Sequence, residues 1–207
     1  MPCGLGFEKH LWSRGTTLVA GIDEAGRGPL AGPVVAAAAI LPTDFSLPGL
    51  NDSKQLTEKV RNALFEVLIG SGKLVCYAVG VAEPAEIDRL NILRASILAM
   101  HRAVTALSVQ PEHLLIDGLP VSSFSQSQTA IVGGDAKSMS IAAASVIAKV
   151  TRDRMMEQWH GEYPQYKFDQ NKGYGTAAHL ESLQIHGPCP IHRRSFAPVT
   201  QTAFLFD

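Results

Sequence analysis

The sequence predicts an α/β protein, with a five-stranded mixed sheet flanked by helices. Strand-like apolar runs come first along the chain, and short strands then alternate with long stretches of helical spacing, an order typical of an α/β sheet of mixed direction. The 207 residues suit one substantial domain with a smaller appendage. Hydrophobic residues make up 46% of the chain, which is enough to bury a core.

Each predicted strand is a short run of apolar or alternating residues. The first, T-L-V-A-G-I-D, is typical of a buried strand, and the second, V-V-A-A-A-A-I-L, is closed by Pro42. The alanines of the second run suggest a central strand with close neighbours on both faces. The third, K-L-V-C-Y-A-V-G-V-A, alternates in the manner of a strand. The five predicted strands are residues 17–23, 34–41, 73–82, 113–117 and 129–132.

Caps and apolar spacing predict four helices. Thr57 is a suitable N-cap for the first, and Pro84 opens the second, in which apolar residues recur at spacings of three and four. The third is rich in alanine. Residues 1–16 are expected to form a loose extension, residues 161–176 a loop, and the tail beyond His186 is expected to be irregular. The predicted helices are residues 57–69, 84–107, 140–159 and 177–186.

Charge and cysteine content limit the class of protein. The formal net charge is −1, so the whole chain carries no strong basic signal for a polyanion, although residues 137–207 hold 8 Lys and Arg against 6 Asp and Glu. Three cysteines without a C-x-x-C pattern argue against a disulfide framework or structural zinc. The N-terminus has no leader pattern and the apolar run 29–41 is too short to span a bilayer. We therefore expect a soluble, cytoplasmic protein.

Carboxylates stand at the carboxyl ends of three predicted strands. Asp23 ends the first strand and Glu24 follows it, Asp117 ends the fourth, and Asp135 follows the fifth. Open α/β sheets build their sites at such ends. Glu24 can join Asp23 only if it already lies in the turn, because adjacent strand side chains point to opposite faces.

Four converging carboxylates would favour their own protonation unless cations join them. Mg²⁺ and similar hard ions take oxygen ligands, and two such ions about 4 Å apart are the apparatus for in-line attack on a phosphodiester. For any single Asp, a loop residue or a helix cap is an equally good interpretation, most of all for Asp135, which precedes a helix. Their shared position at strand ends favours the metal site.

The turn after the first carboxylates is rich in glycine. Gly26, Gly28 and Gly32 give G-x-G-x-x-x-G and lead into another strand, so the dinucleotide-binding pattern G-x-G-x-x-G opening a helix is not met. What remains is a backbone that can approach a ligand closely, with Arg27 available for phosphate.

These residues together resemble ribonuclease HII, the bacterial type 2 ribonuclease H. The likeness begins with G-I-D-E-A-G-R-G-P-L-A-G-P-V-V and continues through L-N-D-S-K-Q-L, L-L-I-D-G, G-G-D-A-K-S, I-A-A-A-S-V-I-A-K-V-T-R-D, K-G-Y-G-T and H-R-R-S-F-A-P-V, spanning residues 17–199. The resemblance implies a ribonuclease H-like fold with a helical C-terminal extension. It divides the chain into an N-terminal extension (1–16), a catalytic domain (17–160) and an extension that completes the substrate site (161–207).

The resemblance also implies an activity. It implies endonucleolytic cleavage of RNA in RNA–DNA hybrids and on the 5′ side of a lone ribonucleotide in duplex DNA, leaving 3′-hydroxyl and 5′-phosphate ends. Two divalent ions, Mg²⁺ or Mn²⁺, would be the cofactors. The substrate duplexes would be the partners, with no membrane, no obligate protein partner and a monomeric enzyme expected.

The family's site residues match positions of this chain. Many relatives have proline at Gly175, and a looser loop around the tyrosine is expected here without a change in chemistry. The matching residues are the metal-site carboxylates Asp23, Glu24, Asp117 and Asp135, the G-R-G turn of Gly26, Arg27 and Gly28, and the substrate-sensing Tyr174.

Further basic residues are candidates for nucleic-acid contacts. Lys54 is a candidate phosphate contact, with an ordinary exposed lysine as the alternative. Arg193 and Arg194 form, with His192, a tight basic cluster that is predicted to touch the DNA backbone, with a solvated surface as the alternative.

Other residues are expected to be structural. Asp153 is expected to pair with Arg152 or Arg154, and His179 and His186 to have structural roles.

Two other functions are possible for a chain of this fold. A non-catalytic nucleic-acid-binding module on the same scaffold would lack one of the carboxylates, and none is missing. A resolvase or integrase of the same fold would cut DNA without ribose, and the G-R-G turn and K-G-Y-G-T argue against it. A duplex with one ribonucleotide, incubated with Mg²⁺ or Mn²⁺, separates all three.

Overall fold

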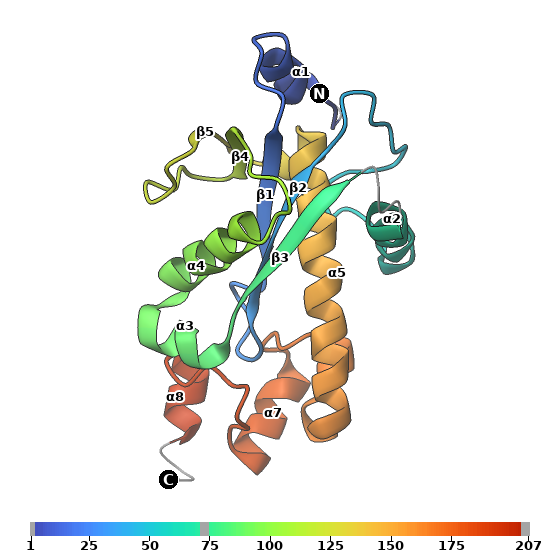
Figure 1. The fold of residues 1–207 in the computed structure, drawn as a ribbon. Helices are drawn as coiled ribbons and strands as arrows, with labels where there is room; N and C mark the ends of the chain where they lie inside the picture. The colour runs from blue at the N-terminus through green and yellow to red at the C-terminus, as the bar shows by residue number, and fades with distance from the viewer. Residues whose placement is uncertain (1–2, 71–74, 204–207) are drawn as a thin grey trace.

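The computed structural model describes residues 3–70 and 75–203 and contains the predicted five-stranded mixed sheet (Figure 1). The strand order is β3-β2-β1-β4-β5. Neighbours β1, β2 and β3 pair antiparallel, whereas β4 runs parallel to β1 and β5 parallel to β4. The strands are β1 (Val19–Ala25), β2 (Val34–Ile40), β3 (Cys76–Ala82), β4 (His113–Asp117) and β5 (Ser127–Ile131). The prediction for the third strand began at residues 73 and 74, which lie outside the described residues.

Two helices cover the two faces of the sheet, α4 (Ile92–Thr105) on one and α5 (Met139–Glu162) on the other (Figure 1). The alanines of β2 serve both faces, since those at even positions pack in the α4-side core and those at odd positions in the α5-side core. On β1, a Cβ at Gly21 would lie 2.1 Å from the Ser140 carbonyl carbon of α5. Small residues therefore let α5 lie directly on the strand that carries Asp23.

The predicted helix over 84–107 is two helices. α3 (Pro84–Leu90) ends at Asn91, whose φ of 70° breaks the helical path. The Asn91 side chain then caps α4 by accepting a hydrogen bond of 3.1 Å from the Arg94 N–H. The break falls at Asn91 because its side-chain oxygen can cap the following helix.

The N-terminal segment is not a loose extension. It contains α1 (Gly6–Trp12), whose Glu8 is fully buried. One Glu8 carboxylate oxygen accepts hydrogen bonds from the Ser138 hydroxyl and from the hydroxyl and N–H of Ser140, at 2.6 to 3.0 Å. A carboxylate at the N-terminus of α5 is favourable because the helix amides and dipole there are positive. This contact holds the N-terminal segment against the start of α5.

The remaining helices lie around this core. α2 (Glu58–Gly70) packs beside α5. The segment 161–176 and the tail, predicted as loop and irregular chain, contain short helices. Aromatic side chains of the first pack on α5 around Met156, and Val199 of the tail packs with Leu183. At the end of the molecule opposite α1 lie α7 and α8 (Figure 1). The short elements are η1 (Gly134–Ala136), η2 (Pro164–Tyr166), α6 (Phe168–Asn171), α7 (Ala177–His186) and α8 (Ala197–Ala203).

Within the described residues, the helices are all too short or too polar to cross a bilayer.

Candidate active site

Asp23 and Asp117 lie side by side because β1 and β4 are parallel neighbours. In their register Ile22 pairs with Ile116, so the next residue of each strand falls at the same level. Asp23 is 4% exposed and its carboxylate accepts a hydrogen bond of 2.8 Å from the Glu24 N–H. The sheet topology thus brings together two carboxylates that are 94 residues apart in the chain.

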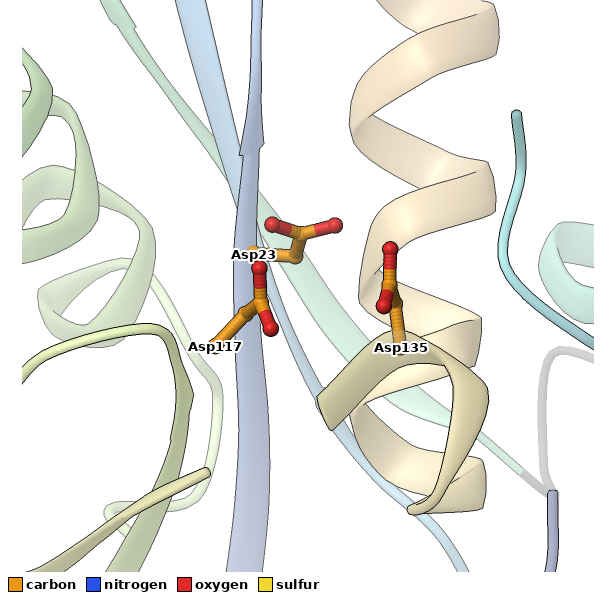
Figure 2. Close-up of side chains that lie close together, drawn as sticks. All are labelled: Asp23, Asp117 and Asp135. Carbon is orange, nitrogen blue, oxygen red and sulfur yellow. The ribbon is translucent and has the colours of Figure 1, made fainter. Parts of the chain in front are cut away.

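Asp135 reaches the same place from η1, the single turn between β5 and α5. The Gly134 N–H of that turn donates to the Asp117 carboxylate at 2.7 Å, which ties the turn to the end of β4. One carboxylate oxygen from each of Asp23, Asp117 and Asp135 lies within 4.8 Å of the other two. Figure 2 shows the three side chains pointing toward one another, with Asp135 next to α5. The predicted convergence is found for these three.

Glu24 is placed differently from the expectation. It still belongs to β1 and pairs with Ala36, so it does not lie in the turn. Its carboxylate forms an ion pair of 3.1 Å with the Arg27 guanidinium and is not part of the three-carboxylate cluster. It does line the same pocket as Asp23 and Asp117, an open cavity of about 360 Å³.

The carboxylate cluster is electrostatically uncompensated. Burial, with the neighbouring Glu24 and Asp117 carboxylates, raises the pKa of Asp23 well above its ordinary value. Burial and the charge of Asp117 likewise raise the pKa of Asp135 to about 6. A bound divalent cation would reverse both effects, and an all-carboxylate donor set is what hard ions such as Mg²⁺ and Mn²⁺ prefer. The residues present therefore fit a metal site.

Lys54, the predicted phosphate contact, lies at this cluster. Its ammonium is 3.7 Å from an Asp135 carboxylate oxygen, while its side chain remains 75% exposed. Partial burial would lower the pKa of Lys54, but the Asp23 and Asp135 carboxylates outweigh it and the pKa is raised. An exposed ammonium at that distance contributes little and leaves the cluster short of positive charge.

The G-R-G turn lies at the same pocket, since Gly26, Arg27 and Gly28 all line it. Gly26 has a φ of 96°, and a Cβ there would lie 2.1 Å from the Nε of Arg152, so only glycine fits. Gly28 is different, because a Cβ would meet only the Tyr174 ring, at 3.6 Å. Tyr174 is 46% exposed and lines the same pocket.

Arg193 does not have its predicted place on the surface. It is fully buried, and its guanidinium donates hydrogen bonds of 2.5 to 3.2 Å to backbone carbonyls. A side chain without exposed surface has no access to a DNA backbone, so the prediction of a direct contact is wrong for Arg193. The four acceptors are the carbonyl oxygens of Gly26, Arg27, Gly32 and Pro33.

A second buried arginine, Arg152, also donates to backbone carbonyls near the G-R-G turn, which the sequence did not predict. Arg152, expected to pair with Asp153, instead donates to the carbonyls of Ala31, Pro33 and Lys172 at 2.9 to 3.1 Å. The sequence signal was the position of Arg152 four residues after Ala148 on the buried face of α5, where an arginine needs acceptors.

The other predicted residues fall as follows. Arg194 is exposed, and its backbone N–H donates to Asp88 at 3.0 Å. Asp153 pairs with Lys149 at 2.7 Å and with Arg61 at 4.0 Å, not with its neighbouring arginines.

The chain is similar to known proteins over most of its length. A family model described as Ribonuclease HII matches residues 20–199. A ribonuclease HII of Desulfitobacterium hafniense (strain DSM 10664 / DCB-2) is 60% identical over 194 residues, which cover 94% of this chain and 74% of that protein.

Solved structures share the fold. Ribonuclease H2 from Pyrococcus horikoshii OT3 has a TM-score of 0.74 and 31% identity, covering 91% of this chain and 98% of that one. A structure of the PCNA:RNase HII complex from Archaeoglobus fulgidus has a TM-score of 0.66 and 25% identity, covering 85% and 93%.

Three carboxylates at the ends of strands, a ribonuclease H-like sheet and a family match over most of the length point to one conclusion. The chain belongs to the ribonuclease HII family, metal-dependent endoribonucleases that act on RNA–DNA hybrids.

Proposed function

We propose that this enzyme cuts both the RNA strand of RNA–DNA hybrids and the 5′ side of a single ribonucleotide in duplex DNA, leaving 3′-hydroxyl and 5′-phosphate ends. The observation that carries the proposal is the approach of Asp23, Asp117 and Asp135 to within 4.8 Å, beside a pocket shared with the G-R-G turn and Tyr174. The first group suits phosphodiester hydrolysis, and the second suits recognition of one ribose.

Asp23, Glu24, Asp117 and Asp135 are the residues that would hold two divalent ions, Mg²⁺ or Mn²⁺. When bound, such ions supply an activated water and a stabilised leaving oxygen. Asp23 and Asp117 are fixed by adjacent parallel strands and Asp135 by the turn bonded to Asp117. Glu24 would have to exchange its ion pair with Arg27 for a metal, which leaves Arg27 available for substrate phosphate.

Recognition of the 2′-hydroxyl is assigned to the G-R-G backbone. The carbonyls of Gly26 and Arg27 point toward Arg193. In a trans peptide the N–H points opposite to the carbonyl, so the amides of Arg27 and Gly28 point away from Arg193. A 2′-hydroxyl can accept from such amides and is the group that distinguishes RNA from DNA. Tyr174 would pack its half-exposed ring against the same sugar.

The remaining contacts are to phosphate. Lys54 lies at the carboxylate cluster, and the exposed Arg194 keeps its predicted role. Phosphate contacts of this kind hold the duplex in place and carry no sequence information.

The domain division supports a joint site. Tyr174, in the extension 161–207, lines one pocket together with Asp23 of the region 17–160, which supports the proposal that the extension completes the substrate site. We propose a monomer in the bacterial cytoplasm that needs no protein partner for cleavage.

The test is a 5′-labelled DNA duplex with one ribonucleotide, incubated with Mg²⁺ or Mn²⁺ and mapped on a denaturing gel beside an all-DNA duplex and an RNA–DNA hybrid. We expect one cut on the 5′ side of the ribonucleotide, cuts in the hybrid, and none in all-DNA. Cleavage of the hybrid alone would remove the single-ribonucleotide activity from the proposal.

A further inference from the structure

A buried imidazole is hydrogen-bonded to the backbone of the loop that carries Tyr174. The Tyr174 carbonyl accepts hydrogen bonds from the Thr176 N–H at 2.8 Å and from Nδ1 of His179 at 2.9 Å. His179 lies in the first turn of α7 and is fully buried. The Tyr174 ring faces the pocket, whereas its backbone is bonded to the protein interior.

His179 is itself bonded to a second buried histidine. Its Nε2 lies 3.0 Å from Nε2 of His192, which is 2% exposed. On the far side of the His192 ring, Nδ1 accepts the Cys189 N–H at 3.0 Å. The four residues therefore form one continuous chain of hydrogen bonds from Cys189 to Tyr174.

This chain of hydrogen bonds fixes the proton on each ring. A carbonyl oxygen has no hydrogen, so Nδ1 of His179 must carry one. A backbone N–H must donate, so Nδ1 of His192 must be without a proton, and the neutral His192 carries its proton on Nε2. Between the two Nε2 atoms His192 is then the donor and His179 the acceptor. One pair of neutral tautomers satisfies these contacts, and the Cys189 thiol, 3.1 Å from the same Nδ1 of His192, can only be a further donor to it.

Packing alone would not need these polar rings. His179 and His192 lie among aromatic neighbours, with Phe168 at 5.4 Å from the His179 ring centroid and Tyr166 at 4.8 Å from that of His192. Burying an imidazole costs free energy unless its nitrogens are bonded, and an apolar ring would fill this space without that cost. Burial also lowers the pKa of both, that of His192 to about 3, which favours the neutral rings.

We propose that His179 and His192 are positioning residues, whose fixed tautomers aim a single N–H at the Tyr174 carbonyl and so hold the Tyr174 ring at the ribose. The proposal rests on the proposed role of Tyr174 in recognising the ribonucleotide. Neither histidine touches substrate in this arrangement, because both are buried beneath the loop.

The tautomers can be read directly in the unaltered protein. In ¹⁵N-histidine-labelled enzyme at pH 7, two-bond ¹H–¹⁵N correlations distinguish a protonated Nδ1 from a protonated Nε2. We expect His179 as the Nδ1–H form and His192 as the Nε2–H form. The His179 resonances are assigned with a His179→Asn sample. Observation of His179 as the Nε2–H form or as imidazolium would overturn the proposal, and this test does not depend on any measurement of activity.

A double-mutant cycle tests the effect on catalysis. His179→Phe keeps the ring volume and removes the donor. We expect turnover of bound single-ribonucleotide substrate to fall about tenfold, because small displacements of a reacting geometry are costly. KM should change less than twofold. In a Tyr174→Ala background the same substitution should have almost no further effect, since residues acting through one another are not additive.

Two further variants separate positioning from folding. His186→Phe makes the same change at an exposed position of α7 and should leave turnover within twofold. His179→Asn offers an amide N–H near the place of Nδ1 and should be closer to the unaltered enzyme than His179→Phe. Equal losses in Asn and Phe variants, or full additivity with Tyr174→Ala, would contradict positioning. If Tyr174→Ala itself left ribonucleotide cleavage unchanged, the role proposed for Tyr174 would fail instead, and the NMR result would stand apart from it.

Discussion

At the ends of β1 and β4 three carboxylates lie close together, whereas around the G-R-G turn two guanidiniums lie buried among backbone carbonyls. Burial and the neighbouring carboxylates raise the pKa of Asp23 and that of Asp135, and the charges of the chain do not offset this. Arg152 and Arg193, by contrast, satisfy their N–H groups with seven hydrogen bonds to carbonyls. The carboxylates lack compensating positive charge within the chain, whereas the guanidiniums have their hydrogen-bond partners within it.

The comparison explains why like charges are tolerated at both places. Neighbouring carboxylates repel one another, so the cluster of Asp23, Asp117 and Asp135 is stabilised only when a cation binds or a proton is taken up. A guanidinium has five donors in a fixed plane and can be saturated by neutral carbonyls. The buried arginines therefore hold the backbone around the turn, whereas the carboxylates are left able to bind a cation.

The largest effect is expected from removing one acid. Asp23→Asn or Asp117→Asn should lower cleavage at least about 100-fold, since even the outer partners of metal ligands cost 10- to 100-fold when removed. Binding of an RNA–DNA hybrid should change little, because phosphate contacts lie elsewhere. Single-turnover cleavage and fluorescence anisotropy measure the two. Lost binding with normal turnover of the bound complex would reverse the assigned roles.

At the G-R-G turn, removal of the buried Arg193 guanidinium should lower the free energy of unfolding. Arg193→Met leaves several carbonyls without donors, and we expect the free energy of unfolding in urea to fall by about 3 kcal/mol or more. The matched control is Arg194→Met at the exposed neighbouring position, where a change of about 0.5 kcal/mol is expected. Similar losses in the two variants would show that burial of Arg193 is not what matters.

Without bound metal, the stability of the fold should depend on pH through the carboxylate cluster. The pKa of Asp135 is about 6 in the folded chain against an ordinary 3.8, so the folded state holds its proton more tightly than the unfolded state. Stability contributed by this group is therefore intact below about pH 4 and is lost as the pH rises through 6. Asp23 acts in the same direction.

The matched variant isolates this contribution. In EDTA, Asp135→Asn should equal the unaltered protein at pH 4 and exceed it by at most about 3 kcal/mol at pH 7, as measured by urea unfolding. Saturating Mg²⁺ should reduce or reverse the difference, because it stabilises only the protein that binds it. A constant difference across this pH range would mean that the pKa of Asp135 is not raised by folding.

The smallest effect is expected at Gly28. Gly28→Ala places a methyl 3.6 Å from the Tyr174 ring, an ordinary contact, so the protein should fold and bind all-DNA duplex normally. Preference for a single-ribonucleotide duplex should fall by a factor of about 3 to 10, as for the loss of a modest hydrogen bond. Gly26→Ala is the contrasting variant, since its methyl would meet Arg152 and should destabilise the fold. Competition binding measures the first and thermal melting the second.

Several elements could be predicted because their signals are local. Five strands and the α5 helix follow from apolar runs, and Asp23, Asp117 and Asp135 stand at strand ends in the sequence itself. The break at Asn91 was missed because apolar spacing continues across it, and only the backbone angle reveals it. The docking of α1 was missed because Glu8 is buried through partners about 130 residues away.

The sequence by itself determined the type of fold, the family and the residues able to bind metal, since these depend on short-range patterns and on motifs in a fixed order. Only the tertiary structure decided that Glu24 pairs with Arg27 and that Arg193 lies inside. A charged residue looks the same in sequence whether water or carbonyls surround it. Its environment is set by segments that meet only when the chain is folded, as the G-R-G turn and the C-terminal segment do here.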